Sequence, residues 1–363
     1  MKLPRLFAAA PERRASPAPR RHVAHPAKGR KSVNLALQGG GAHGAFTWGV
    51  LDYLLEDGRL AFEGISGTSA GAMNAVVLAD GLVRGGTEGA RERLAEFWTG
   101  VSRASTIGGA RDLVQSWMTF WDIDPLRPSQ WLDAFANLTS PYGFNPHNIN
   151  PLRELLVGMV DFERLGAAGA PKLFISATHV RSGKIKVFSD GEVSADAVMA
   201  SACLPYLFQT VFVDGEPYWD GGFMGNPALF PFFTETRAGD ILLVQINPVE
   251  RSAVPTTTKA ILERMSEITF NASLLREFRA IDFVNRMLDE GRLDPARYRK
   301  NRMHRIEASR ALAEFSAMTK FDTSIAFFGR LRDAGRAAAK DWLAANHDAI
   351  GVRGTVDLRG EFS

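Results

Sequence analysis

Cysteine is nearly absent from this chain of 363 residues, and long hydrophobic runs are absent altogether. The single cysteine, Cys203, excludes an intramolecular disulfide and fits a reducing compartment. No apolar run reaches the roughly 18 residues that a membrane-spanning helix needs. Histidine, cysteine and carboxylate residues do not cluster with the spacing of metal ligands, so no metal site is predicted. We therefore expect a cytoplasmic protein without a membrane span.

Acidic residues are scarce at the N-terminus, where residues 1–31 contain nine Lys or Arg and only one Glu. This segment carries +8, and because the whole chain carries +3, the rest carries −5. It is rich in Pro, Ala and Arg without apolar periodicity, which predicts a disordered basic leader. Its run "LFAAA" is shorter than the roughly 7 to 15 residues of a secretion signal. The leader is either solvated and without a partner, which we favour, or a peripheral contact to anionic lipid at the inner membrane surface. No specific nucleic-acid contact is expected.

The rest of the chain has the composition of a folded protein, with 45% hydrophobic and 23% charged residues overall. An apolar run at 33–37 predicts a buried strand, and a helix is predicted over 45–58, with Gly58 at its end. A second strand at 61–67 and a second helix at 69–81 follow. Strand, glycine turn and helix, repeated in this way, favour a parallel sheet with covering helices.

Later segments extend this α/β pattern. Strands are predicted at 172–180, 184–188, 210–222 (two short ones) and 240–248, and a helix at 194–204. The stretch 85–165 holds four tryptophans and predicts a helical insertion over the sheet. From about 255 the pattern is helical, and His304 and His347 are expected in solvated helices. We therefore divide the chain into the leader, a catalytic domain at 32–250, and a helical C-terminal region at 251–363 packed on the same domain.

The pentapeptide Gly67-Thr68-Ser69-Ala70-Gly71 lies between a predicted strand and a predicted helix. This is the setting of a nucleophile elbow, in which small neighbours allow a sharp turn that exposes the serine hydroxyl. The following helix directs its partial positive charge toward developing negative charge. The alternative is a serine that only caps a helix. The strand–turn–helix context favours Ser69 as a nucleophile.

A serine nucleophile needs a base, and two candidates follow it in the sequence. His179, at the end of a predicted strand, could complete a triad of Ser, acid and His. Asp220 lies at a strand end beside Trp219 and Phe223, where partial desolvation would make its carboxylate a stronger base than in water. It could take the Ser69 proton directly. The alternative for Asp220 is a turn residue, which is common in Asp-Gly sequences.

The glycine-rich stretch "LQGGGAHGAF" at 37–46 fits two kinds of loop. Gly39, Gly41 and Gly44 match G-x-G-x-x-G, a dinucleotide fingerprint that requires an acidic residue about 20 positions further on at a strand end. Glu63 has this spacing but is expected to start its strand, which is the wrong end. Because the chain continues into the serine elbow, we assign the loop to an oxyanion hole, with the N–H groups of Gly40 and Gly41 facing Ser69.

Together these motifs resemble the patatin-like phospholipases, over about residues 33–247 and including "ASACLPYLF" at 200–208. The resemblance implies a three-layer α/β/α fold with a mainly parallel sheet, and hydrolysis of lipid acyl esters without a cofactor. It implies a Ser69–Asp220 dyad without histidine, in which Asp220 is the general base. The oxyanion hole it implies is formed by Gly39, Gly40 and Gly41, and the motif-supporting residues are His43, Gly44, Gly67, Gly71, Gly221 and Gly222.

Two positions depart from the family pattern. Gln38 precedes the glycines where many relatives have Asp, and His43 stands where Lys or Arg is usual. A histidine side chain titrates near neutrality, so His43 either makes the field at the oxyanion loop depend on pH or merely packs against the following helix.

Two rival functions differ from the patatin-like interpretation. One is an α/β-hydrolase-type esterase with a Ser-His-Asp triad that uses His179. The other is a lipid-binding regulatory protein without turnover, recruited by its basic leader. A serine-reactive probe separates a hydrolase from a binding protein, because the binding protein should not react.

The charge of the leader leads to a first prediction. Deleting residues 1–31 should weaken binding to anionic vesicles at low salt, because each basic residue near the surface contributes up to about 1 kcal/mol and salt screens the attraction. Hydrolysis of a soluble short-chain ester should not change. Equal vesicle sedimentation with and without the leader would refute the lipid role.

Overall fold

The computed structural model describes residues 29–106, 140–146, 148–167, 169–251, 253–308, 312, 319 and 322–362. The predicted leader as far as residue 28, and most of the tryptophan-rich stretch, lie outside the described residues, as do His22, His25 and His147. No helix in the described ranges is long and apolar enough to cross a membrane. The same ranges contain no group of three His, Cys, Asp or Glu that could hold a metal ion.

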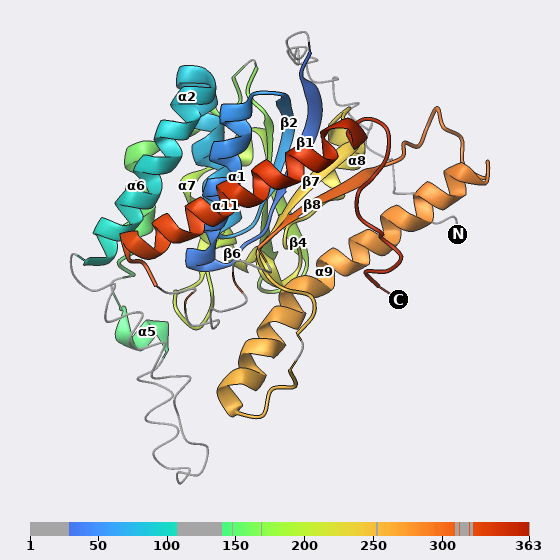
Figure 1. Ribbon diagram of the computed structural model, residues 1–363. Coiled ribbons are helices and arrows are strands. Elements are labelled where there is room, and N and C mark those ends of the chain that lie inside the picture. The colour runs from blue at the N-terminus through green and yellow to red at the C-terminus, as the bar shows by residue number, and fades with distance from the viewer. Residues whose placement is uncertain are drawn as a thin grey trace, which may run out of the picture.

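Within the described residues, eight strands form one sheet with the order β5-β6-β3-β2-β1-β7-β8, and β4 pairs with β3 (Figure 1). The pairs β1–β2, β1–β7, β2–β3 and β7–β8 are parallel, whereas β4, β5 and β6 pair antiparallel. The strands are β1 Lys31–Leu37, β2 Leu60–Gly67, β3 Lys172–His179, β4 Ile185–Ser189, β5 Val211–Val213, β6 Glu216–Asp220, β7 Asp240–Gln245 and β8 Arg302–Glu307. The prediction of a mainly parallel sheet is confirmed.

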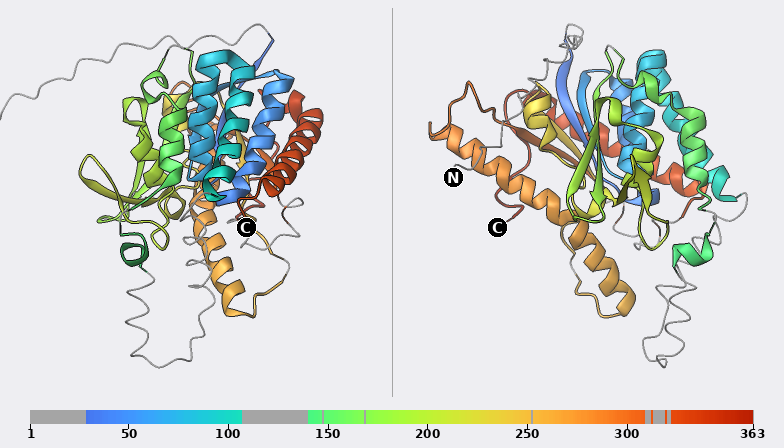
Figure 2. Two further views of the ribbon diagram at one scale, coloured as in Figure 1. Left: turned by 90° about the vertical axis from the view of Figure 1, so that its left-hand side faces the viewer. Right: turned by 180° about the vertical axis from the view of Figure 1, so that it is seen from behind.

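Helices cover both faces of this sheet (Figures 1 and 2). They are α1 Gly44–Asp57, α2 Ala70–Thr106, α5 Pro141–Phe144, α6 Pro151–Met159, α7 Ala195–Ser201, α8 Pro231–Glu235, α9 Thr258–Asp289 and α11 Ile325–Asn346. On one face, Leu35 and Leu37 of β1 belong to a large apolar core with α1, α2, α7 and α11. On the other, Ala36 belongs to a smaller core with α8 and α9. Alternate residues of β1 thus face opposite cores, which gives the predicted three layers.

Two expectations about the ends of the domain need correction. Residues 302–307, expected in a helical region, form β8, which adds a parallel strand next to β7. His304 is therefore fully buried rather than solvated, and its Nε2 lies 3.0 Å from Asp240 Oδ1. Lys31, assigned to the leader, begins β1, and its ammonium donates to the carbonyls of His347 and Ile350. A deletion of the leader should therefore end at residue 28.

The helix predicted to start at Ser69 is longer than expected. Within α2, Gly85 and Gly86 have non-helical dihedral angles, and the chain folds back so that Ala90 lies against Gly81. The second half of α2 carries Phe97 and Trp98 into the large core. Residues 87–106, predicted as part of the insertion, thus form part of the main helical layer.

One edge of β3 is shared by two strands, and this sharing brings two distant segments together. Residues 174 to 178 of β3 pair with β4 on one edge, so β2 and β6 must both occupy the other edge. There β2 ends with Gly67 opposite Ile175, and β6 ends with Asp220 opposite Ala177. The end of β6 therefore lies just beyond the end of β2.

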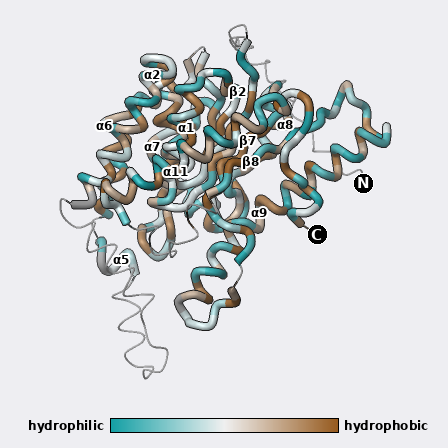
Figure 3. The backbone as a smooth tube through the Cα atoms, viewed as in Figure 1, coloured by the Kyte–Doolittle hydropathy of each residue, from teal (hydrophilic) through white to brown (hydrophobic). Residues whose placement is uncertain are grey.

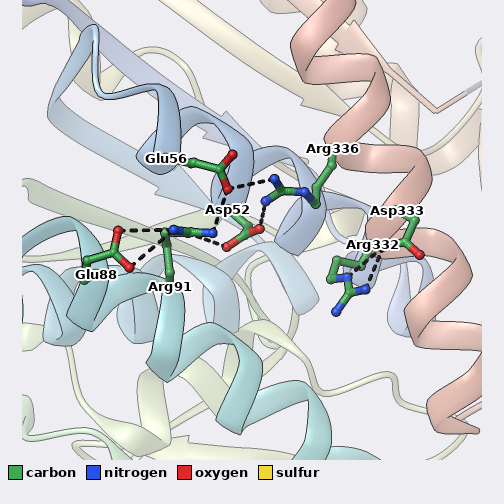
Figure 4. Close-up of polar contacts among 7 residues, drawn as sticks. All are labelled: Asp52, Glu56, Glu88, Arg91, Arg332, Asp333 and Arg336. Atoms are coloured by element: carbon green, nitrogen blue, oxygen red, sulfur yellow. Dashed lines mark hydrogen bonds and ion pairs between the residues drawn. The ribbon is translucent and has the colours of Figure 1, made fainter.

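Helix α11 packs closely across α1, and the contact depends on two glycines. A Cβ atom at Gly49 would lie 1.9 Å from the Arg332 carbonyl oxygen, and one at Gly335 would lie 2.1 Å from the Phe46 carbonyl oxygen. Only glycine permits this approach of two backbones. Ion pairs flank the crossing: Figure 4 shows Arg336 bound to Asp52 and Glu56, and both carboxylates also accept from Arg91 of α2. In Figure 3, the tube coloured by hydropathy is mostly hydrophobic in the central strand β7, on the sheet that these helices cover.

The close crossing predicts a large cost for Gly335→Ala. The new methyl group must separate α11 from α1, so we expect a loss of about 2 kcal/mol in unfolding free energy, despite the better helix propensity of alanine. Gly329→Ala on the same helix is the matched control, because nothing lies within 4 Å of its Cβ position. That variant should be as stable as the parent or slightly more so in denaturant titrations. Equal stabilities of the two variants would contradict the proposed packing.

Candidate active site

Ser69 lies in a strained turn between β2 and α2. β2 ends at Gly67 and α2 begins at Ala70, so the chain reverses direction within two residues. The φ angle of Ser69 is 54°, a left-handed conformation that non-glycine residues seldom adopt. Its N–H group donates to Ser201 Oγ in α7 over 2.9 Å. Such strain clusters at functional sites, where the surrounding structure maintains it.

The two glycines of the Gly67–Gly71 pentapeptide allow this turn to close. A Cβ atom at Gly67 would lie 2.5 Å from the Gly71 carbonyl oxygen, and one at Gly71 would lie 2.1 Å from the Leu37 carbonyl oxygen. The start of α2 thus rests directly on the end of β1. Gly44 allows the start of α1 to lie equally close to the start of α2, since its Cβ position is 2.7 Å from the Ala70 methyl group.

Asp220 ends β6, and its carboxylate is completely buried next to the serine. Burial raises the pKa of this carboxyl group to about 7, because the charged form loses its hydration. Two neighbours oppose this effect: the Gly222 N–H, which donates to Oδ1 over 2.6 Å, and the nearby Ser69 hydroxyl. The other carboxylate oxygen, Oδ2, is buried and has no hydrogen-bond partner among the described residues. The backbone of Asp220 is fixed by Thr178, whose hydroxyl donates to the Asp220 carbonyl, and by its own N–H, which donates to the Cys203 carbonyl.

Gly221 and Gly222 follow Asp220 and are closely enclosed. A Cβ atom at Gly221 would lie 2.1 Å from the Ser176 carbonyl oxygen, and one at Gly222 would lie 2.9 Å from Asp220 Oδ1. Both positions therefore need glycine for the chain to turn tightly beneath the carboxylate. This is the reason that an Asp-Gly-Gly sequence stands here.

The glycine-rich loop after β1 lies against the serine. A Cβ atom at Gly39 would be 2.8 Å from the Ser69 Cβ. The Gly39 N–H donates to Asn226 Oδ1 over 2.7 Å, and the Gly39 carbonyl accepts from Asn247 Nδ2 over 2.6 Å. In the described part of the chain, the N–H groups of Gly40 and Gly41 have no hydrogen-bond acceptor. Two free donors therefore remain on the loop that lies against Ser69.

A family model, the patatin-like phospholipase model, matches residues 35–233, which contain the serine elbow, the glycine loop and Asp220. The chain belongs to the patatin-like phospholipase family. This membership confirms the predicted family and supports a lipid hydrolase function. No match was found among curated protein sequences.

Two solved structures are similar to this patatin-like chain. One is VipD from Legionella pneumophila, with 18% identity and a TM-score of 0.41, covering 88% of this chain and 68% of VipD. The other is the ExoU–SpcU complex from the type III secretion system of Pseudomonas aeruginosa, with 20% identity and a TM-score of 0.30. That match covers 92% of this chain and 65% of the other.

Gln38, one of the two departures from the family pattern, is buried and bonds to three separate segments of the chain. Its side-chain oxygen accepts from the N–H groups of Ile246 and Asn247, both over 2.9 Å. Its side-chain nitrogen donates to the Asn226 carbonyl oxygen and to Asn271 Oδ1 of α9. An amide can donate and accept at once, whereas a carboxylate can only accept. The sequence did not reveal this role, because every partner of Gln38 lies about 190 or more residues away.

His43 is buried and contacts the C-terminal region. Its Nε2 lies 2.7 Å from Thr319 Oγ1, and its ring is 6.3 Å from that of Phe327 in α11. These contacts favour a packing role for His43. An electrostatic role, in which its charge would make the oxyanion loop respond to pH, stays a prediction. Ser201 and Asn226, which hold Ser69 and Gly39, were not identified from the sequence, because a single Ser or Asn gives no distinctive signal.

His179 and Glu63, the other candidate site residues, make hydrogen bonds away from Ser69. The two ring nitrogens of His179 lie 2.8 Å from Ser182 Oγ and Glu216 Oε2, all within or next to the β3–β4 and β5–β6 hairpins. Glu63, the candidate ribose ligand, accepts from the backbone N–H groups of Arg237 and Ala238. Both residues thus have structural partners away from Ser69.

The contacts of Gln38 predict the effect of a change that preserves its shape. Gln38→Glu would place a carboxylate against two acceptors, so we expect a loss of about 2–3 kcal/mol in unfolding free energy. The loss should grow as pH rises, because a buried Glu has a raised folded pKa and its ionisation above the unfolded pKa of about 4.3 opposes folding. Gln209→Glu is the control: its amide also donates to two carbonyl oxygens, those of Asn145 and Pro146, but the side chain is partly exposed, so water can solvate the new charge. A loss for Gln38→Glu that is no larger than the control would contradict this role.

Proposed function

We propose that this chain is a lipid acyl hydrolase that cleaves carboxylic esters through an acyl-enzyme, without a metal or other cofactor. The observation that carries the proposal is the position of Ser69, in a strained turn beside the buried carboxylate of Asp220. A hydroxyl group in this setting has a base within reach and a substrate-facing position. Membrane or micellar lipids are the substrate class that fits the family.

In the first half-reaction Asp220 would take the Ser69 proton as the serine oxygen attacks the ester carbonyl. A carboxyl group with a pKa of about 7 is well matched to this work, because it is a far stronger base than an exposed aspartate and is still largely ionised above neutral pH. It then returns the proton to the leaving alcohol. Activity should therefore rise as pH increases through about 7.

The tetrahedral intermediate carries a negative oxygen, which needs hydrogen-bond donors. The free N–H groups of Gly40 and Gly41 are suited to this task, whereas the N–H of Gly39 is already bound to Asn226. The proposed oxyanion hole thus consists of Gly40 and Gly41, with Gly39 providing close approach to Ser69. Removing one such donor typically costs about 2.7–4 kcal/mol in the transition state.

The second half-reaction would release the acyl group to water. Asp220, ionised again, accepts a proton from a water molecule that attacks the acyl carbonyl, and the same two N–H groups hold the new oxyanion. The released fatty acid leaves Ser69 protonated and Asp220 ionised. Every proton transfer in this scheme uses the single Asp220 carboxylate, so no histidine is needed.

The triad alternative has less support. His179 would have to exchange its bonds to Ser182 and Glu216 for one to Ser69. A binding protein without turnover would have no need for the strained serine or the buried acid. The proposal therefore keeps the Ser-Asp dyad and treats both alternatives as outcomes of its test.

Three variants test the dyad. Ser69→Ala and Asp220→Asn should each reduce hydrolysis of p-nitrophenyl esters by about 10⁴-fold or more, and the double variant should be little worse, because nucleophile and base act as one unit. His179→Ala should retain near-normal kcat and also react with a fluorophosphonate probe. Retained activity in Asp220→Asn together with its loss in His179→Ala would establish a triad instead, and an unreactive wild type would favour a binding protein.

A further inference from the structure

The N-terminal part of α9 extends beyond the sheet, as Figures 1 and 2 show. Ile261, Met265 and Ile268 follow one another at spacings of four and three residues, so they lie on one face of this helix. Their exposed fractions are 43%, 57% and 54%. We call these three residues the α9 apolar face. Contiguous exposed apolar surface of this kind usually marks an interaction site.

The same part of α9 turns its acidic side chains away from this face. Glu267 is buried, and its carboxylate binds Arg251 over 2.6 Å and Arg264 over 3.2 Å. Glu263 is partly buried. Among the side chains described between 258 and 269, the exposed ones are all apolar or hydroxyl-bearing: Thr258, Ile261, Met265, Ser266, Ile268 and Thr269. An uncharged face with large apolar side chains is the kind that enters a lipid surface.

The residues immediately after this face touch both catalytic loops. The Phe270 ring packs on Phe223 at 5.4 Å and lies 3.1 Å from the Cβ position of Gly222, next to Asp220. Asn271 accepts from Gln38, which precedes the glycine loop. The α9 apolar face thus begins within one helical turn of the site and continues outward from it.

From these observations we propose that the α9 apolar face docks on a phospholipid bilayer and holds the Ser69 site at the membrane surface. The inference rests on the proposed function in one respect, since the lipid substrate of that function resides in a bilayer. Apolar insertion, rather than charge, supplies the binding, because the exposed described side chains of this face are uncharged. A second copy of the chain on the same face is an outcome that the test below would reveal.

The test compares vesicle binding in a Ser69→Ala background, in which binding is separate from hydrolysis. The variant I261S/M265S/I268S should sediment with phosphatidylcholine vesicles about a hundredfold more weakly than its parent, because three half-exposed side chains lose their transfer into lipid. High salt screens any contribution of the basic leader. The single Met265→Ser variant should lose about fivefold, which keeps the test valid if the triple variant folds poorly.

The matched control is V157S/F283S/V352S, which removes three other exposed apolar side chains. Phe283 lies 13 residues beyond Phe270 on α9, and Val352 follows the segment bound by Lys31 at the start of β1. This control should bind vesicles as the parent does. With Ser69 intact, both triple variants should hydrolyse a soluble short-chain ester at the parental rate, since none of these residues belongs to the catalytic machinery.

Three results would overturn the proposal. The first is a parent that does not bind vesicles, and the second is an I261S/M265S/I268S variant that binds as tightly as the control. The third is a variant that loses self-association in light scattering but keeps vesicle binding, which would assign the face to a second copy. Failure of the parent to hydrolyse the soluble ester would contradict the proposed function alone, because vesicle binding is measured without turnover.

Discussion

The Asp220 carboxylate is held in the interior beside the hydroxyl of Ser69, without a cationic partner among the groups that shift its pKa, and its Oδ2 has no hydrogen-bond partner among the described residues. A buried carboxylate is costly when it is charged, and the raised pKa measures that cost. The sheet imposes this position, because β6 continues the edge of β3 that β2 leaves at Gly67. Strand pairing thus holds this energetically unfavourable group next to Ser69.

The glycine loop depends on parts of the chain outside the family match. Gln38 bonds to Asn271 of α9, and His43 contacts Thr319 and Phe327. Residues beyond 251, predicted as a helical region packed on the same domain, therefore hold the loop from both faces of the sheet. β8 and α11 extend the same sheet and the same core, so the C-terminal region is part of the machinery that positions the site.

The sequence predicted most strands, the parallel sheet and the Ser69 turn because these features have local signatures. An apolar run followed by glycines reports a buried strand and its turn without reference to the rest of the chain. The strand at 302–307 was missed because the two apolar residues of "RMHRIE", Met303 and Ile306, are three positions apart, which is a helical spacing. Its pairing with β7 involves residues about 60 positions earlier and leaves no local signal. The bonds of Gln38 and Asn226 connect segments about 190 or more residues apart, so no local pattern could indicate them.

The pH dependence of stability tests the buried Asp220 carboxylate most directly. Its pKa is about 7 when folded and about 3.9 when unfolded, so its contribution to stability is complete below the unfolded value and is lost as pH rises toward 7. An asparagine does not titrate, and its side chain has nearly the same shape. The wild type should therefore lose stability relative to Asp220→Asn as pH rises. The difference between their unfolding free energies should change by about 3 kcal/mol, in favour of the variant, between pH 5 and pH 8. A difference between the two proteins that stays constant over this range would contradict a buried Asp220 carboxylate with a raised pKa.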